Sequence, residues 1–123
     1  MKLRLLPEIF GILKLTPPQP FPDWLQTAGI YFVAQTEDEF SVMCPQQHIL
    51  AGIDYDADWR CFRVEDVAYD EVGVVARVSQ PLADAGLSLF LVSTHDRDYV
   101  FVAESNLQQA IDHYKIAQLD VTE

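Results

Sequence analysis

The sequence predicts an α+β protein that consists of two units with the same order of strands and helices. Apolar residues at helical spacing, followed by Gly86, indicate a helix that begins at Gly73. Two β-prone runs, "LSLFLVS" and "DYVFVA", enclose the polar turn "THDR" and indicate a hairpin. Residues 59–123 therefore follow the order strand, helix, strand, strand, helix, strand of a ferredoxin-like βαββαβ unit. Residues 1–58 are expected to form a degenerate copy of it.

The first half consists of expected strands joined by irregular segments. The run "LRLLPEIFGILKL" is β-prone but interrupted at Pro7 and Gly11, so it predicts two short strands or one bent strand. Four prolines between Pro17 and Pro22 exclude a helix and ladder hydrogen bonds, which predicts an extended surface connection. The runs "GIYFVAQ" and "FSVMC" are predicted strands around the acidic "TEDE", and residues 45–59 hold a short helix or a loop.

The second half has the clearer periodicity. Residues 60–67, "RCFRVEDV", predict a strand, and Pro81 is expected to bend the helix that follows it. Ser105 to Gln108 have the spacing of a capping box and predict the start of a second helix. One apolar stripe supports that helix: Leu107, Ala110, Ile111 and Tyr114. The run "AQLDV" predicts a last strand.

Composition excludes several classes of partner. The chain has 123 residues, 50% of them hydrophobic, and a formal net charge of −11. Nucleic acids and anionic membranes are recognised by clustered Lys and Arg, so we expect neither as a partner. No long apolar segment follows the first residues, which predicts a cytoplasmic protein. Cys44 and Cys61 each lie in apolar, strand-like sequence, where buried thiols are expected rather than a disulfide.

The sequence contains no complete catalytic or metal-binding motif. The acidic run from Asp54 to Glu65 matches the spacing of carboxylates in a calcium loop, but Trp59 stands where the loop needs glycine. No histidine has a His or Cys partner at ligand spacing. His95 could gather a metal with Asp96 and Asp98, but a polar turn is the simpler explanation there. No serine, threonine or cysteine has a recognisable base. We therefore expect no enzyme, no metal and no cofactor.

A few polar residues suit ligand binding. Gly73 precedes a helix and can expose backbone N–H groups to a carboxylate, while Asp96 and Asp98 could meet an ammonium group. Ser88 opens the strand between them, so the set would match a free amino acid. In the alternative interpretation, Gly73 eases a tight turn, Ser88 is an exposed strand residue, and the two aspartates stabilise a hairpin.

The run "PLADAGLSLFLVSTHDRDYVFVAESNL", with "WRCFRV" and "FVAQTEDEFSVM" before it, resembles ACT domains of the CASTOR type. These are small bacterial ACT proteins and the animal cytosolic arginine sensors. The resemblance extends from Tyr31 to Tyr114, and residues 1–30 fit it only loosely. It implies two ACT-like units per chain, with amino acids bound at interfaces between units.

The resemblance also implies particular site residues. Ser88 matches a ligand-binding serine, Leu89 offers backbone groups, and the stretch Val72-Gly73-Val74 matches a contributing backbone. Asp98, and after it Asp96, is the expected partner of the ligand's ammonium group. The arginine sensors carry two such halves, so an equivalent pocket here would form across a homodimer.

These observations predict a non-enzymatic sensor that binds a free amino acid and whose ligand-bound state is recognised by a protein partner. A second hypothesis is an ACT-fold interaction module without a ligand. The third is an enzyme or enzyme fragment that would use the cluster of His95, Asp96 and Asp98.

Overall fold

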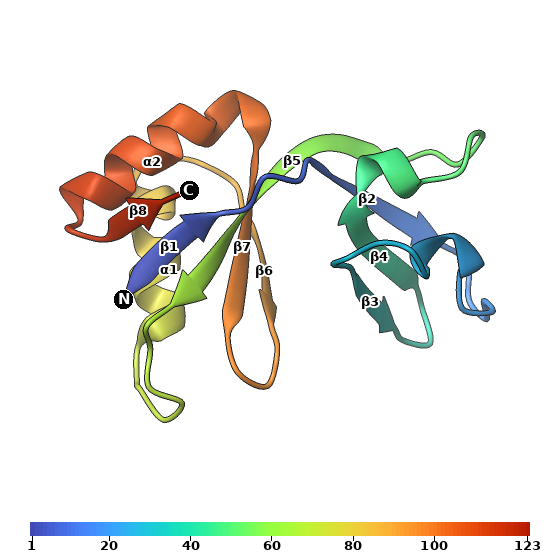
Figure 1. Cartoon of the computed structure of the whole chain (residues 1–123), viewed down its shortest axis with the longest axis horizontal. Coiled ribbons are helices and arrows are strands. Elements are labelled where there is room, and N and C mark those ends of the chain that lie inside the picture. Colours follow the sequence, from blue (N-terminus) through green and yellow to red (C-terminus); the bar gives the residue numbers. More distant parts are fainter. The chain divides into compact units, whose positions relative to one another are not determined.

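The computed structural model describes residues 1–123 and divides into two compact units (Figure 1). One unit consists of Met1–Pro7 and Arg60–Glu123, and the other of Glu8–Trp59. The expected division into residues 1–58 and 59–123 differs from these units chiefly at the N-terminus. The first seven residues pack with the second half of the chain, because the first strand joins the sheet of that half.

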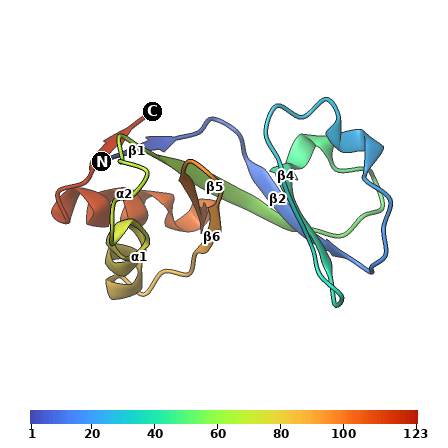
Figure 2. The same cartoon turned by 90° about the horizontal axis from the view of Figure 1, so that it is seen from below.

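The unit of residues 1–7 and 60–123 contains the predicted βαββαβ order with one added strand. After β5 (Asp56–Glu65) come α1 (Val74–Asp84), β6 (Phe90–Ser93), β7 (Asp98–Ala103), α2 (Leu107–Ile116) and β8 (Asp120–Thr122). The added strand is β1 (Lys2–Leu5), which lies antiparallel to β5 and parallel to β8. The sheet order is therefore β6-β7-β5-β1-β8, with β6 at one edge. Both helices cover the same face of these strands (Figure 2).

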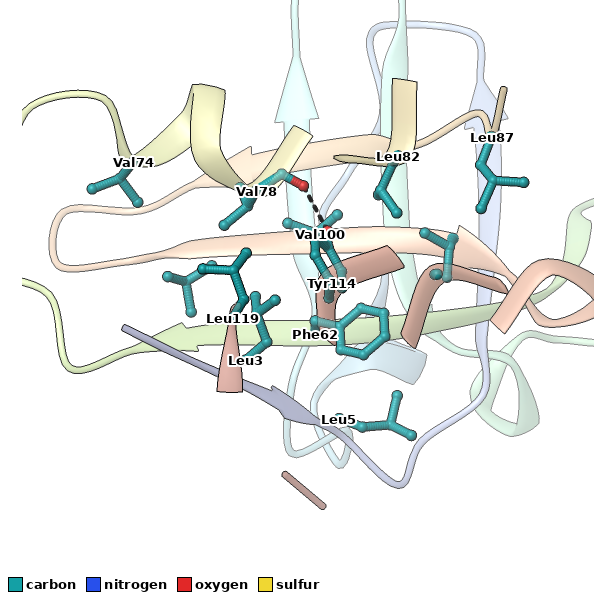
Figure 3. Close-up of a cluster of buried hydrophobic side chains, with 13 residues drawn as sticks. Leu3, Leu5, Phe62, Val74, Val78, Leu82, Leu87, Val100, Tyr114 and Leu119 are labelled. Carbon is teal, nitrogen blue, oxygen red and sulfur yellow. Dashed lines mark hydrogen bonds between the residues drawn. The ribbon is translucent and has the colours of Figure 1, made fainter. Parts of the chain in front are cut away.

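The core of this unit joins both helices to the sheet (Figure 3). Tyr114 of α2 is fully buried, and its hydroxyl donates a hydrogen bond of 2.6 Å to the Val78 carbonyl of α1. Its ring meets Phe62 of β5 edge-on, with 5.4 Å between ring centroids. Burial raises the pKa of Tyr114 well above its ordinary value, so the hydroxyl remains a donor. The two helices are thereby fixed to each other and to β5.

The unit of residues 8–59 has the same strand order with its helices reduced to single turns. It contains β2 (Phe10–Leu15), η1 (Asp23–Leu25), β3 (Phe32–Gln35), β4 (Phe40–Pro45) and η2 (Gln46–His48), and it ends with residues 56–59 of β5. The sheet order is β3-β4-β2-β5, and neighbouring strands are antiparallel. This is the order of a ferredoxin-like unit in which two 3-10 turns replace the helices. The predicted α+β fold with two ACT-like units is confirmed.

Several boundaries differ from prediction. Strand β5 begins at Asp56 and β6 at Phe90, so the first is longer and the second shorter than the sequence pattern indicated. The predicted capping box does not form: a 3-10 turn, η3 (Glu104–Asn106), precedes α2, and no side chain caps that helix. Residues 16–22 form the predicted irregular connection, and both cysteines are buried. Neither helix combines the length and apolar character needed to span a membrane.

Candidate functional site

A hollow of about 600 Å³ lies at one end of the sheet formed by residues 1–7 and 60–123. Three segments line it: the end of β5 with the loop after it, the first turn of α1, and the turn between β6 and β7. Among the residues predicted from the sequence, the hollow brings together Gly73, Val74, Asp96 and Asp98. Two distant stretches of the predicted site thus share one cavity.

Gly73 sets the backbone at the start of α1. Its φ of 87° and ψ of 9° lie in the left-handed region, which glycine adopts without the steric cost that a Cβ brings. No side chain caps the helix, and the first helical bond there runs from Arg77 N–H to the Gly73 carbonyl. The N–H groups of Val74, Val75 and Ala76 therefore have no partner within the helix. These three residues line the hollow, where their N–H groups and the helix dipole favour an anion.

The turn between β6 and β7 uses part of its polar side chains to hold its own shape. Thr94 donates from its backbone N–H and from Oγ1 to the Arg97 carbonyl, at 2.8 and 3.0 Å. Ser93 Oγ donates to Asp98 Oδ1 across the strand pair. These bonds connect the two ends of the turn, and the half-buried Asp98 keeps its second carboxylate oxygen for another donor.

Ion pairs neutralise the carboxylates on the β5 side. Glu65 accepts from Arg4 Nε at 3.1 Å and from Arg63 Nε at 2.8 Å. These hydrogen bonds, first Arg4 and then Arg63, hold the pKa of Glu65 below its usual value. Asp66 lies 3.6 Å from Lys2 Nζ. The acids of this wall are therefore occupied within the chain.

The other charged side chains around the hollow are only partly paired. Glu71 pairs with Arg77 at 3.4 Å, and Asp96 Oδ1 lies 2.6 Å from His95 Nδ1. Asp98 and Arg97 also line the hollow, but neither side chain forms an ion pair. One carboxylate and one guanidinium thus remain for a ligand.

The other predicted site residues lie elsewhere. Ser88 is exposed in the link between α1 and β6, two residues before the strand begins, and Leu89 beside it packs against the core. Ser93 pairs with Asp98, so Ser88 lies five residues from the turn, about 16 Å along an extended backbone. Val72 is 92% exposed, and the hollow does not include it. Within one chain, the serine and the aspartate cannot touch the same small ligand.

Tyr69 and Arg97 are among the lining residues that sequence reasoning did not assign to the site. Tyr69 lies in the loop after β5, where no periodicity marked it, and Arg97 stands between the two predicted aspartates. The Tyr69 ring faces the imidazole of His95, with 5.1 Å between centroids and 31° between planes. The contact connects two walls of the hollow that are far apart in sequence.

The residues do not form a metal centre. No three His, Cys, Asp or Glu side chains are arranged to hold a metal ion. The acidic run considered for calcium contains the strand Asp56–Glu65, whereas a calcium loop would turn sharply there and open a helix.

Models of known protein families match both halves of the chain. A family model for the ACT domain matches residues 54–113, and a model for an N-terminal domain matches residues 8–51. The human cytosolic arginine sensor for mTORC1 subunit 1 is 34% identical over 56 residues, which are 44% of this chain. The chain spans only 17% of that relative's length.

Solved structures extend the similarity to nearly the whole chain. An Agrobacterium tumefaciens protein superposes with a TM-score of 0.91 at 31% identity, over 98% of this chain and 90% of that one. The regulatory subunit of aspartate kinase from Thermus thermophilus has a TM-score of 0.62 at 16% identity, over 89% and 93% of the two chains. The chain belongs to the ACT-domain family.

Proposed function

We propose that this protein is a non-catalytic regulator that binds a free amino acid in the hollow at the start of α1. The observation that carries the proposal is the pair of side chains without ion partners, Asp98 and Arg97, beside an uncapped helix N-terminus. An amino acid carries one ammonium and one carboxylate group on a single carbon. The hollow offers one group of each opposite charge.

The ligand would use both kinds of group at once. Its ammonium would donate to the carboxylate of Asp98, a charge-assisted bond that is stronger than a neutral one. Its carboxylate would accept from Arg97 or from the backbone N–H groups of the first turn of α1. Gly73 itself has no side chain that could cover those N–H groups, and the space where a Cβ would stand is open.

We further propose that the site is completed across a homodimer. Strand β6 pairs only with β7, which leaves its other edge for a second copy of the chain. A two-fold axis at the centre of β6 would pair Phe90 with Ser93 of the partner subunit in an antiparallel ladder. Continuing that register places Ser88 opposite His95 of the partner subunit, at the turn that lines the hollow. The dimer would thereby unite residues that one chain keeps about 16 Å apart.

The relatives support a regulatory role. One is named a cytosolic arginine sensor and another is named the regulatory subunit of aspartate kinase. The bound amino acid would stabilise one arrangement of the dimer over another. A partner protein that binds only one of these arrangements would then respond to the amino acid.

A thermal-shift screen of the full chain against the twenty amino acids at millimolar concentration tests the proposal. We expect one or a few amino acids to raise the melting temperature. Asp98→Asn should reduce the shift, and Asp38→Asn, in the hairpin turn of the other unit, should keep it. If no amino acid shifts the wild-type protein, amino-acid binding is refuted and an ACT-fold interaction module becomes the better explanation.

A further inference from the structure

We infer that the hollow selects amino acids whose side chains are uncharged and apolar or aromatic. This inference rests on the proposed function and adds the chemical class of the ligand. Two independent observations support it: the charge balance around the cavity, and the nature of the wall left for the ligand's side chain.

The charges around the hollow balance, although the chain as a whole carries −11. Five carboxylates line the cavity, and five Lys or Arg side chains pair with them or lie beside them. The carboxylates are Glu65, Asp66, Glu71, Asp96 and Asp98. The cations are Lys2, Arg4, Arg63, Arg77 and Arg97. A neutral zwitterion fits this balance, because its ammonium and carboxylate groups use Asp98 and Arg97.

A charged side chain on the ligand would lack a partner. A guanidinium or second ammonium would need another carboxylate, but Glu65, Asp66 and Glu71 already face cations of this chain. Asp96 is bonded to His95. A second carboxylate on the ligand would need another cation, but Lys2, Arg4, Arg63 and Arg77 already pair with acids of this chain. Either charge would lose water without gaining a compensating contact.

The wall beside the charged pair is aromatic and apolar. Tyr69 is 75% exposed and Val75 is 47% exposed, and both line the hollow. The rings of Tyr69 and His95 already lie close together, with 5.1 Å between centroids and 31° between planes. Large exposed apolar groups at a cavity are typical of binding surfaces, and a flat or branched apolar side chain would cover them. A guanidinium could also stack on Tyr69, so the charge balance decides between arginine and neutral ligands.

Titration calorimetry of the 123-residue chain with matched ligands tests the inference. Each pair differs chiefly in charge: arginine and citrulline, lysine and norleucine, glutamate and glutamine; phenylalanine is added as the flat ligand. We expect the neutral member of each pair to bind at least tenfold more tightly, and phenylalanine to bind more tightly than alanine. Tighter binding of arginine than citrulline would overturn the inference while leaving the proposed function intact. Absence of binding by every ligand would refute the proposed function itself.

A variant pair tests the wall separately. Tyr69→Ala should weaken phenylalanine binding about 3- to 10-fold and leave alanine binding nearly unchanged, since only the larger side chain reaches the ring. Tyr55→Ala is the matched control, because Tyr55 is also an exposed tyrosine, at 40%, but lies in the other unit. Equal loss of both ligands in Tyr69→Ala would show that the wall does not select the side chain.

Discussion

If one subunit supplies Ser88 and the other supplies Asp98, two defective variants should restore a site when they are combined. Ser88→Ala and Asp98→Ala homodimers each lack one half of both sites. In a heterodimer of the two, one site has lost both side chains and the other keeps both. A site built within one chain would instead be defective in both subunits.

The size of each defect follows from the contact that is lost. Asp98 would make a charge-assisted hydrogen bond from a half-buried position, so its removal should cost about 1.5 kcal/mol, or roughly tenfold in Kd. Ser88 would make a neutral hydrogen bond worth about 1 kcal/mol, or roughly fivefold. The doubly altered site should bind on the order of fiftyfold more weakly than the intact one, if the two effects add.

The assay is titration calorimetry of heterodimers purified through two different affinity tags, with the amino acid found in the thermal-shift screen. We expect half of the sites in the Ser88→Ala and Asp98→Ala heterodimer to have wild-type affinity. The reciprocal heterodimer, of wild type and the double variant, should have no intact site. If the double-variant heterodimer retains half of its sites and the first heterodimer none, the site lies within one chain and the reasoning from the β6 edge is refuted.

Four further predictions concern stability and reactivity. Tyr114→Phe removes a buried hydrogen bond of 2.6 Å and should lower the free energy of unfolding by about 1 kcal/mol in urea denaturation; an unchanged midpoint would contradict it. Gly73→Ala places a Cβ at a φ of 87° with no atom of the chain within 4 Å, so backbone strain alone should cost about 1 to 2 kcal/mol. Gly29→Ala also has open space but no positive φ, and it should cost less. The pKa of Glu65 is lower in the folded than in the unfolded state, so its ion pairs stabilise the fold above the unfolded value of 4.5 and lose that contribution as the pH falls further. Glu65→Gln should therefore flatten the acid limb of the stability profile, measured by denaturation between pH 3 and 7. Burial raises the pKa of Cys44 to about 11, so a thiol reagent at pH 8 should modify it only after denaturant opens the fold.

The fold was largely predictable because the second half of the chain has strong local signals. The apolar stripe that ends at Gly86 specified α1, and the alternation around the turn at residues 94–97 specified the hairpin. The position of β1 was not predictable in this way. Its residues are β-prone in either unit, and only long-range pairing with β5 and β8 decides which sheet it joins.

The capping box shows where a local pattern fails. Ser105 and Gln108 have the required spacing, yet residues 104–106 form a 3-10 turn and α2 begins at Leu107. Gln108 donates instead to Asp112, one turn further along the helix. The side chain that the pattern assigned to the cap has a competing partner, which a short motif does not reveal.

The candidate site was predictable in its residue types but not in its distances. Gly73 and Asp98 were found as separate signals, a helix start and a polar turn, and the structure brings them to one hollow. Ser88 was expected in the same site. It precedes β6, whereas Asp98 pairs with Ser93 at the other end of that strand, so the strand separates Ser88 from Asp98. Tyr69 gave no signal, since a single aromatic residue in an irregular loop resembles any exposed side chain.

The comparison of the two units explains why we expect one site per chain. Both have the same strand order, so both have a strand, a crossover and a hairpin turn in corresponding places. In residues 8–59 the first crossover is the three-residue turn η1, which is too short to present a row of free N–H groups with a helix dipole behind them. The corresponding hairpin turn carries acids but no basic residue. Its free backbone N–H groups are also fewer, because Thr36 Oγ1 already accepts those of Asp38 and Glu39. Anion binding therefore depends on the crossover that remained an α-helix, and a dimer of this chain should bind two amino acids rather than four.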